Sequence, residues 1–308
     1  MRPASHSSRA RAALATLLGA LALPLLVAPP ALASYIAPED KGGSPNADDI
    51  HTLYLIVFFL GIAIFLLVEG VLIYSVIKFR YRRGGPPAAQ IRGNTPLEVG
   101  WTIGAAAILV VLTVVTFAFL GPIKNPAASK PGGYVAEQRA SQPSQPGTGQ
   151  AHRGTVQFAP VSQPAPPGPA NTHLNIQVNG QQYIWRFDHP GSQQVFSYHD
   201  MYVPTNTTVT LDITSADVAH SWWIPALGGK ADAIPGYHNH TWFRISKPGV
   251  YEGQCAELCG ENHADMKASV IAVSPAQFRA WEKKQAADLR QSQALLALSR
   301  KTRGQVGP

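Results

Sequence analysis

Fold and chemistry both follow most directly from the stretch Gly253-Gln-Cys255-Ala-Glu257-Leu-Cys259-Gly-Glu-Asn-His263-Ala-Asp-Met266. Its two cysteines are the only ones in the 308 residues, and they lie four positions apart. A histidine follows four residues later, and a methionine three residues after that. Thiolate, imidazole and thioether together form a ligand set that suits copper. Two thiolates at this spacing can share metal ions, so the stretch predicts a copper site, with a bridged pair of ions as the favoured form.

A further histidine, His220, completes a set of five side-chain donors. A structural zinc would use both cysteines and both histidines and would need no methionine. A mononuclear blue-copper site takes one cysteine, two histidines and a weak methionine, which leaves one thiolate over. A disulfide at this spacing is possible but uncommon. Two copper ions bridged by both sulfurs use every donor, with one histidine per ion and the remaining positions filled by Met266 and a backbone carbonyl.

Short segments of alternating apolar and polar residues surround the ligand stretch. We interpret six of them as strands: 174–178, 183–187, 207–213, 242–245, 249–252 and 268–273. Turn residues separate them at intervals typical of a β-sandwich or barrel, and no long amphipathic helix interrupts them. Residues 173–275 therefore predict an all-β Greek-key domain. Its ligand loop joins the last two strands, and His220 lies at the end of a neighbouring strand.

The charge of the chain is unevenly distributed. The whole sequence carries a formal charge of +7. Residues 173–275, however, contain five basic and nine acidic residues, for a net charge near −4. A nucleic-acid-binding protein carries its positive charge on the folded domain, so no nucleic-acid partner is expected. An acidic domain suits a cationic protein partner instead.

Two apolar runs precede this domain, at 53–77 and 99–120. Each is long enough to cross a hydrocarbon layer of ~30 Å. Between them lie five basic residues, with no acid before Glu98: Lys78, Arg80, Arg82, Arg83 and Arg92. Such an excess of positive charge marks a cytoplasmic loop. Residues 53–120 therefore predict a transmembrane helical hairpin with a cytoplasmic loop at 78–97 and both ends outside.

Two acidic residues accompany the hairpin. Glu69 lies inside the first run, where a carboxyl group normally faces protein or water. We interpret it as a neutral, hydrogen-bonded group against a partner helix, with a proton carrier as the alternative. Glu98 lies at the start of the second run, three residues after Thr95. This spacing predicts a helix start with Thr95 as the N-cap and Glu98 in the favourable first turn.

The flanking regions are less informative. Residues 1–33 combine early arginines, an apolar stretch and Ala31-Leu32-Ala33, which predicts a secretory signal peptide, with an uncleaved anchor helix as the alternative. Residues 34–52 then form an extracytoplasmic segment. Residues 121–172 are rich in Pro, Gly, Ser and Gln and are predicted to be a linker. The basic tail at 276–308 is predicted to be helical and either solvated or frayed.

These features resemble subunit II of cytochrome c oxidase, the subunit with the dinuclear copper A centre, over residues 50–285. Three further stretches carry the resemblance: Asn94-Thr-Pro-Leu-Glu98-Val-Gly-Trp101, Ser215-Ala-Asp217-Val-Ala-His220-Ser-Trp and Lys230-Ala-Asp-Ala-Ile-Pro-Gly236. The resemblance implies an α+β membrane protein with a transmembrane hairpin and a cupredoxin-like Greek-key domain. It also implies six copper A ligands: the side chains of His220, Cys255, Cys259, His263 and Met266, and the carbonyl of Glu257.

The resemblance further implies a function. Such a subunit accepts electrons from cytochrome c and passes them to haem in subunit I, where oxygen is reduced, so the chain would be an oxidoreductase component of a proton-pumping complex. The implied partners are subunits I and III, a c-type cytochrome and the bacterial cell membrane, with both termini and the copper domain outside. The carboxylate of Glu257 would reach a magnesium ion shared with subunit I, and Glu98 would lie at the mouth of a proton path. The chain contains no Cys-X-X-Cys-His motif, so no haem of its own is expected.

The sequence departs from the family pattern at two positions. Tyr183 stands where the aromatic patch that receives electrons often begins with tryptophan, and Trp185 follows, so these two residues are the predicted electron inlet. Tyr237 replaces the arginine that commonly follows the Ile-Pro-Gly turn. Two rival assignments remain. The copper domain of nitrous oxide reductase shares the ligand motif but lacks the hairpin, and a copper-delivery or zinc-stabilised membrane module would bind metal without passing electrons to a partner.

Overall fold

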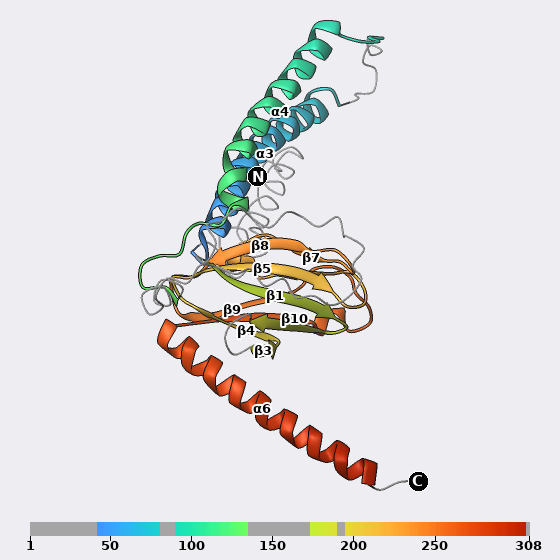
Figure 1. Cartoon of the computed structure of the whole chain (residues 1–308). Coiled ribbons are helices and arrows are strands. Elements are labelled where there is room, and N and C mark those ends of the chain that lie inside the picture. The colour runs from blue at the N-terminus through green and yellow to red at the C-terminus, as the bar shows by residue number, and fades with distance from the viewer. Residues whose placement is uncertain (1–41, 81–89, 135–172, 190–194, 306–308) are drawn as a thin grey trace, which may run out of the picture. The chain divides into compact units, whose positions relative to one another are not determined.

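The structure is a computed structural model that describes residues 42–80, 90–134, 173–189 and 195–305 (Figure 1). The chain divides into two compact units, 1–38 and 39–308, and every described residue belongs to the second. The predicted signal peptide lies outside the described residues. So do residues 34–41, the middle of the predicted cytoplasmic loop at 81–89, and residues 135–172 of the predicted linker.

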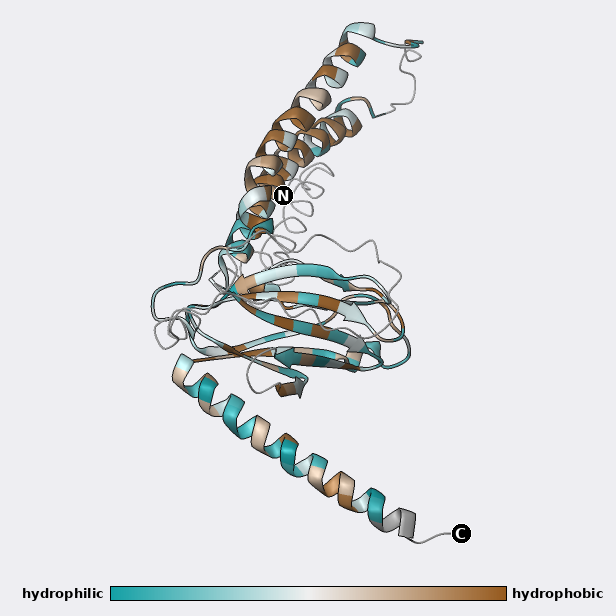
Figure 2. Cartoon of the chain, in the orientation of Figure 1, coloured by the Kyte–Doolittle hydropathy of each residue, from teal (hydrophilic) through white to brown (hydrophobic). Residues whose placement is uncertain are grey.

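Two long apolar helices open the described chain: α3 (Pro45–Lys78) and α4 (Thr95–Lys124). Figure 2 shows apolar residues along most of both helices. At a rise of about 1.5 Å per residue, each exceeds the ~30 Å thickness of a bilayer core. Both helices extend beyond the apolar runs at 53–77 and 99–120, because their polar first turns are helical too. Each has a proline in its first turn, where a missing N–H costs no intrahelical hydrogen bond.

Asn94, rather than the predicted Thr95, caps the start of α4. The side-chain oxygen of Asn94 accepts the N–H of Leu97 at 3.3 Å. In return, the carboxylate of Glu98 accepts the N–H of Asn94 at 3.1 Å. This reciprocal pair satisfies two N–H groups that have no partner within the helix. Glu98 therefore has a defined structural role at the helix start, whereas Glu69 lies half-buried in α3.

In the described part of the chain, ten strands form two five-stranded sheets, which confirms the predicted β-sandwich. The first sheet has the order β3-β2-β1-β5-β8, with β1 (His173–Gln181), β2 (Ile184–His189), β3 (Val195–Tyr198), β5 (Thr208–Ser215) and β8 (Asn239–Arg244). The second has the order β4-β10-β9-β6-β7, with β4 (Asp200–Pro204), β6 (His220–Trp223), β7 (Ala231–Ala233), β9 (Gly249–Cys255) and β10 (Lys267–Val273). The pairs β1–β5 and β4–β10 are parallel, and the other pairs are antiparallel.

The core lies between the two sheets. In β1 the residues Leu174, Ile176 and Val178 are buried, whereas those between them are exposed, as the period of two along a strand requires. The sequence alternation predicted β1, β2, β5, β8, β9 and β10. It missed β3, β4, β6 and β7, which have three to five residues each and are too short for a period to be read.

The predicted linker at 121–172 is not free at its start. Helix α4 runs to Lys124, and the chain after it bonds to strand β5. Thr208 donates its hydroxyl to the carbonyl of Ala127 at 2.5 Å and its N–H to the hydroxyl of Ser129 at 2.9 Å. Tyr134 is buried edge-on against Phe278, with ring centroids 4.9 Å apart. We call residues 125–134 the strap. Its composition does not indicate these contacts, because they involve mainly backbone and small side chains.

The C-terminal tail is one continuous helix, α6 (Pro275–Gln305), and its first half is packed rather than solvated. Phe278 is fully buried, and Trp281 stacks on Tyr202 of β4 with ring centroids 4.8 Å apart. The side-chain amide of Gln285 donates to the carbonyl of Phe196 in β3 at 2.8 Å. Residues 290–301 are exposed, as the sequence predicted for the whole tail.

Candidate metal centre

The loop between β9 and β10 is closed at its base by backbone hydrogen bonds. The N–H of Cys255, the last residue of β9, donates to the carbonyl of Met266 at 2.9 Å. The N–H of Ala256 donates to the carbonyl of Ser221 in β6 at 2.8 Å. Strand β6 pairs with β9 in the register Trp222↔Cys255, and this register brings the start of β6 beside the loop. A short 3-10 helix, η3 (His263–Asp265), turns the loop back toward β10.

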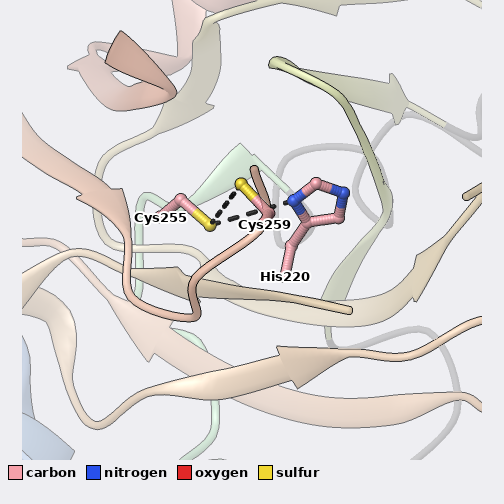
Figure 3. A group of neighbouring side chains, drawn as sticks. All are labelled: His220, Cys255 and Cys259. Carbon is pink, nitrogen blue, oxygen red and sulfur yellow. Dashed lines mark hydrogen bonds between the residues drawn. The ribbon is translucent and has the colours of Figure 1, made fainter. Parts of the chain in front are cut away.

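The two cysteines and two histidines meet as two sulfur–imidazole pairs. The sulfurs of Cys255 and Cys259 lie 3.9 Å apart, as Figure 3 shows with His220 beside them. The Nδ1 of His220 lies 3.9 Å from the sulfur of Cys255, and the Nδ1 of His263 lies 3.5 Å from the sulfur of Cys259. A disulfide requires about 2.05 Å between sulfurs, so both cysteines are free and the disulfide alternative is excluded.

The remaining two predicted ligands complete the group. The thioether of Met266 lies 3.9 Å from the sulfur of Cys259. The carbonyl oxygen of Glu257 lies 3.3 Å from the sulfur of Cys255, whereas the carboxylate of the same residue is exposed. Both sulfurs, the thioether and the His220 ring are buried, and the ring of His263 is half-buried. The structure therefore brings all six predicted donors to one place.

The donor set fits a soft, positively charged metal. Burial and the neighbouring Cys255 raise the pKa of the Cys259 thiol to about 11. With that pKa the thiol is neutral at neutral pH, and because thiols bind metals as thiolates, only a bound cation would displace its proton there. His220, Cys255 and Cys259 also place one ligand atom each within 4.8 Å of one another. Buried sulfur ligands with imidazoles and a thioether are consistent with copper.

Asp217 orients the ring of His220. Its carboxylate lies 2.9 Å from the Nε2 of His220, which leaves Nδ1 facing the sulfurs. The same carboxylate accepts the N–H groups of Gln182 and Val218 at 2.8 and 2.7 Å. Burial would raise the pKa of Asp217, but these hydrogen bonds hold it below its usual value. Such carboxylate–histidine pairs orient metal ligands, a role the sequence analysis missed, although an acid three residues before a ligand histidine is a readable signal.

Both the helical part and the β-sheet part of the chain match a known protein family. Residues 39–119 match the family profile "Cytochrome C oxidase subunit II, transmembrane domain", and residues 192–273 match "Cytochrome C oxidase subunit II, periplasmic domain". Cytochrome c oxidase subunit 2 of Thermostichus vulcanus is 33% identical over 254 residues, which cover 78% of this chain and 76% of that protein. The chain belongs to the cytochrome c oxidase subunit II family. It is thus a membrane protein with two membrane-spanning helices and a periplasmic, cupredoxin-like domain.

Two other subunit 2 sequences agree with this membership. The subunit 2 of Cereibacter sphaeroides is 33% identical over 244 residues, covering 77% of this chain and 76% of that protein. The subunit 2 of Alkalihalophilus pseudofirmus is 30% identical over 260 residues, and the match covers 84% of this chain but only 64% of that protein. A solved periplasmic domain of subunit II from Bradyrhizobium japonicum is 33% identical, covers 37% of this chain and 94% of that domain, and has a TM-score of 0.37.

The two aromatic residues predicted as the electron inlet lie in different environments. Trp185 is fully buried, and its ring approaches that of His220 edge-on with centroids 5.8 Å apart. Tyr183 is half-buried, and its hydroxyl accepts the N–H of Glu261 in the ligand loop at 3.1 Å. Gly260, at a φ of 132°, lies so close that a Cβ there would come within 2.6 Å of that hydroxyl. Of these two residues only Tyr183 is partly exposed, whereas Trp185 is buried beside the candidate ligand His220.

Proposed function

We propose that this chain is the electron-accepting subunit II of a proton-pumping cytochrome c oxidase and holds a dinuclear copper A centre. The proposed ligands are the six donors described above: His220, Cys255, Glu257 through its carbonyl, Cys259, His263 and Met266. The observation that carries the proposal is the presence of one imidazole for each sulfur, with the sulfurs 3.9 Å apart. When bound, the copper pair supplies a one-electron relay from a c-type cytochrome to the haem of subunit I. A single ion would leave one sulfur–imidazole pair unused.

The chain itself contributes to this relay by holding the ligands in fixed positions and by keeping water away from them. The hydrogen bond from Cys255 to Met266 joins the two ends of the loop, the bond from Ala256 ties the loop to β6, and Asp217 fixes the His220 ring. Ligands held in this way move little when the charge of the bound metal changes, so the barrier to electron transfer stays small. Burial of both sulfurs keeps water from them, which favours transfer of electrons over bond-making chemistry with a substrate.

The surface around the ligand loop suits a soluble, cationic electron donor. Leu258 is 79% exposed beside the ligand carbonyl, and the exposed acid Glu261 lies three residues further along the loop. Tyr183 lies against the same loop. We assign this surface to a c-type cytochrome, with Tyr183 in direct contact and Trp185 behind it. Opposite charges at the edge of such a surface accelerate association, so the rate should fall as salt rises.

The remaining family roles are part of the same proposal. The exposed carboxylate of Glu257 is assigned to a magnesium ion shared with subunit I, because its carbonyl already faces the sulfurs. Subunits I and III are the proposed partners in the membrane, with both termini and the copper domain on the extracytoplasmic side. Glu98 is assigned to proton uptake at the cytoplasmic end of α4. A proton there must compete with the bond that Glu98 accepts from Asn94.

Metal content and electron transfer test the proposal together. The complex is purified with the wild-type chain and with Met266→Leu, and the copper bound by this subunit is measured by elemental analysis. We expect two copper ions per chain in the wild type. Met266→Leu should keep both ions but change the reduction potential and slow reduction by a c-type cytochrome in stopped flow. One copper ion per chain, or zinc in its place, would refute the dinuclear assignment and favour a metal-storage or zinc-stabilised module.

A further inference from the structure

The two-residue turn between β1 and β2 contacts the ligand loop through two hydrogen bonds. The side-chain amide of Gln182 donates to the carbonyl of Cys259 at 2.6 Å. The hydroxyl of the next residue, Tyr183, accepts the N–H of Glu261 at 3.1 Å. These two bonds reach the loop on either side of Gly260. Neither turn residue is among the six candidate ligands, so the turn acts on the metal centre through the backbone of the loop.

The backbone of Gln182 reaches the other half of the metal centre. Its N–H donates to one carboxylate oxygen of Asp217 at 2.8 Å. The second carboxylate oxygen of Asp217 lies 2.9 Å from the Nε2 of His220, the imidazole that is paired with the sulfur of Cys255. Gln182 therefore contacts both sulfur–imidazole pairs. It bonds directly to the backbone of Cys259 and acts on His220 through Asp217.

Strand pairing in the first sheet fixes the place of this turn. Gln181 pairs with Ile184, so the connection between β1 and β2 has only two residues. Strand β1 also pairs in parallel with β5, as far as Gly180 opposite Ser215, so its end lies beside the chain that leads to His220. The approach is close, because a Cβ on Gly180 would lie 2.9 Å from the His220 ring. The position of the turn therefore follows from the sheet itself.

The outer part of the ligand loop depends on this turn for its attachment. A Cβ on Gly260 would lie 2.6 Å from the hydroxyl of Tyr183 and 2.9 Å from the side-chain nitrogen of Gln182, so the loop packs directly against the turn. In the described part of the chain, residues 257–262 form no other hydrogen bond to a strand or turn outside the loop. The bond between Cys255 and Met266 closes only the base of the loop.

We propose that Gln182 is a positioning residue of the metal centre, which fixes the Cys259 half of the ligand set relative to the His220 half. The inference rests on the proposed function, because it concerns the same ligands. Groups outside the ligand shell orient the ligands and thereby tune the affinity and the potential of a bound metal. Without the amide of Gln182, the loop would keep its closed base but lose one of the two bonds that hold residues 257–262.

Gln182→Met tests this role, because methionine is unbranched and neutral like glutamine but has no amide donor. The backbone N–H that bonds to Asp217 stays in place. In the metal-free, full-length chain in detergent, amide hydrogen exchange of residues 256–266 should be about tenfold faster in Gln182→Met than in the wild type, because loss of a hydrogen bond favours local opening. The copper-loaded variant should still hold two ions. It should release them to a chelator about 10–100-fold faster, and its reduction potential should differ from that of the wild type.

Gln181→Met is the matched control, since Gln181 is the exposed residue just before the turn. It should match the wild type in exchange, copper release and potential, and both metal-free variants should unfold at the wild-type temperature. Wild-type exchange, release and potential in Gln182→Met would overturn the inference and leave the two-copper assignment standing, and equal changes in Gln181→Met would also overturn it. One copper ion per chain in every variant would instead refute the proposed function, and faster exchange in Gln182→Met alone would then still support its hold on the loop.

Discussion

The resistance of the sandwich to acid should depend on His189, at the end of β2. Its side chain is buried, with 2% of the residue exposed, and it packs edge-on against Trp281 of α6 at 4.9 Å. The Nε2–H donates to the carbonyl of Tyr202 at 3.0 Å, while the buried Nδ1 has no hydrogen-bond partner among the described residues. Burial lowers the pKa of His189 to about 4, with the bond to Tyr202 opposing the shift. A proton on Nδ1 would place a charge among aromatic rings.

The sign and the size of the effect follow from this pKa. The unfolded chain binds the proton with a pKa of about 6.5, so between pH 6.5 and 4 it holds more protons than the folded chain, and stability falls as the pH falls. The full difference between the two pKa values corresponds to about 3 kcal/mol in the free energy of unfolding. Of this, about 2 kcal/mol should be lost between pH 7.5 and pH 5.

Thermal unfolding of the full-length chain in detergent at the two pH values measures this loss. His189→Gln keeps a neutral N–H donor but cannot titrate, so its unfolding temperature should fall less between pH 7.5 and pH 5 than that of the wild type. His199→Asn removes an exposed histidine and should leave the wild-type pH dependence unchanged. If His189→Gln retained the full pH dependence, the buried neutral imidazole would not be the cause and the reasoning would be refuted.

Three further predictions concern α6, the ligand loop and α4. Phe278→Ala should lower the free energy of unfolding by about 3–5 kcal/mol and expose α6 to proteolysis. Leu296→Ala, in the exposed half of the helix, should change it by less than about 0.5 kcal/mol. Equal effects of the two variants would contradict the packing of α6 on the sandwich. Gly253→Ala should displace the ligand loop and lower copper retention, because a Cβ there would lie 2.1 Å from the carbonyl oxygen of Trp223; wild-type copper content would contradict this. Glu98→Ala and Glu98→Gln should both slow proton-coupled turnover with unchanged copper content, and wild-type turnover in Glu98→Gln would leave Glu98 as a helix cap only.

The clustering of the candidate ligands was predictable from the sequence because their chemistry is rare and local. Cys255, Cys259, His263 and Met266 lie within twelve consecutive residues, and few metals use all three donor types. The long apolar helices were also predictable, because crossing a bilayer requires a long run of apolar residues that is easily recognised in a sequence. The helix ends were less predictable, because a cap such as Asn94 is chosen by side-chain hydrogen bonds that several neighbouring residues could make.

The features that sequence reasoning missed depend on contacts between distant segments. The strap at 125–134 is held by bonds to β5, and nothing in its Pro- and Gly-rich composition indicates them. One side of the first half of α6 packs on the sandwich because Phe278 and Trp281 contact residues of β2 and β4, whereas its sequence alone fits a solvated helix. The burial of Trp185 beside His220 likewise follows from the packing of β2 under the ligand loop.

The electron spin resonance spectrum of the partly oxidised copper-loaded protein tests the central proposal most directly. An unpaired electron shared equally between two copper nuclei gives a seven-line hyperfine pattern, and the two sulfur–imidazole pairs predict this sharing. Cys255→Ser should abolish the pattern. A four-line pattern from a single copper ion in the wild type would contradict the account, as would a seven-line pattern that survives in Cys255→Ser.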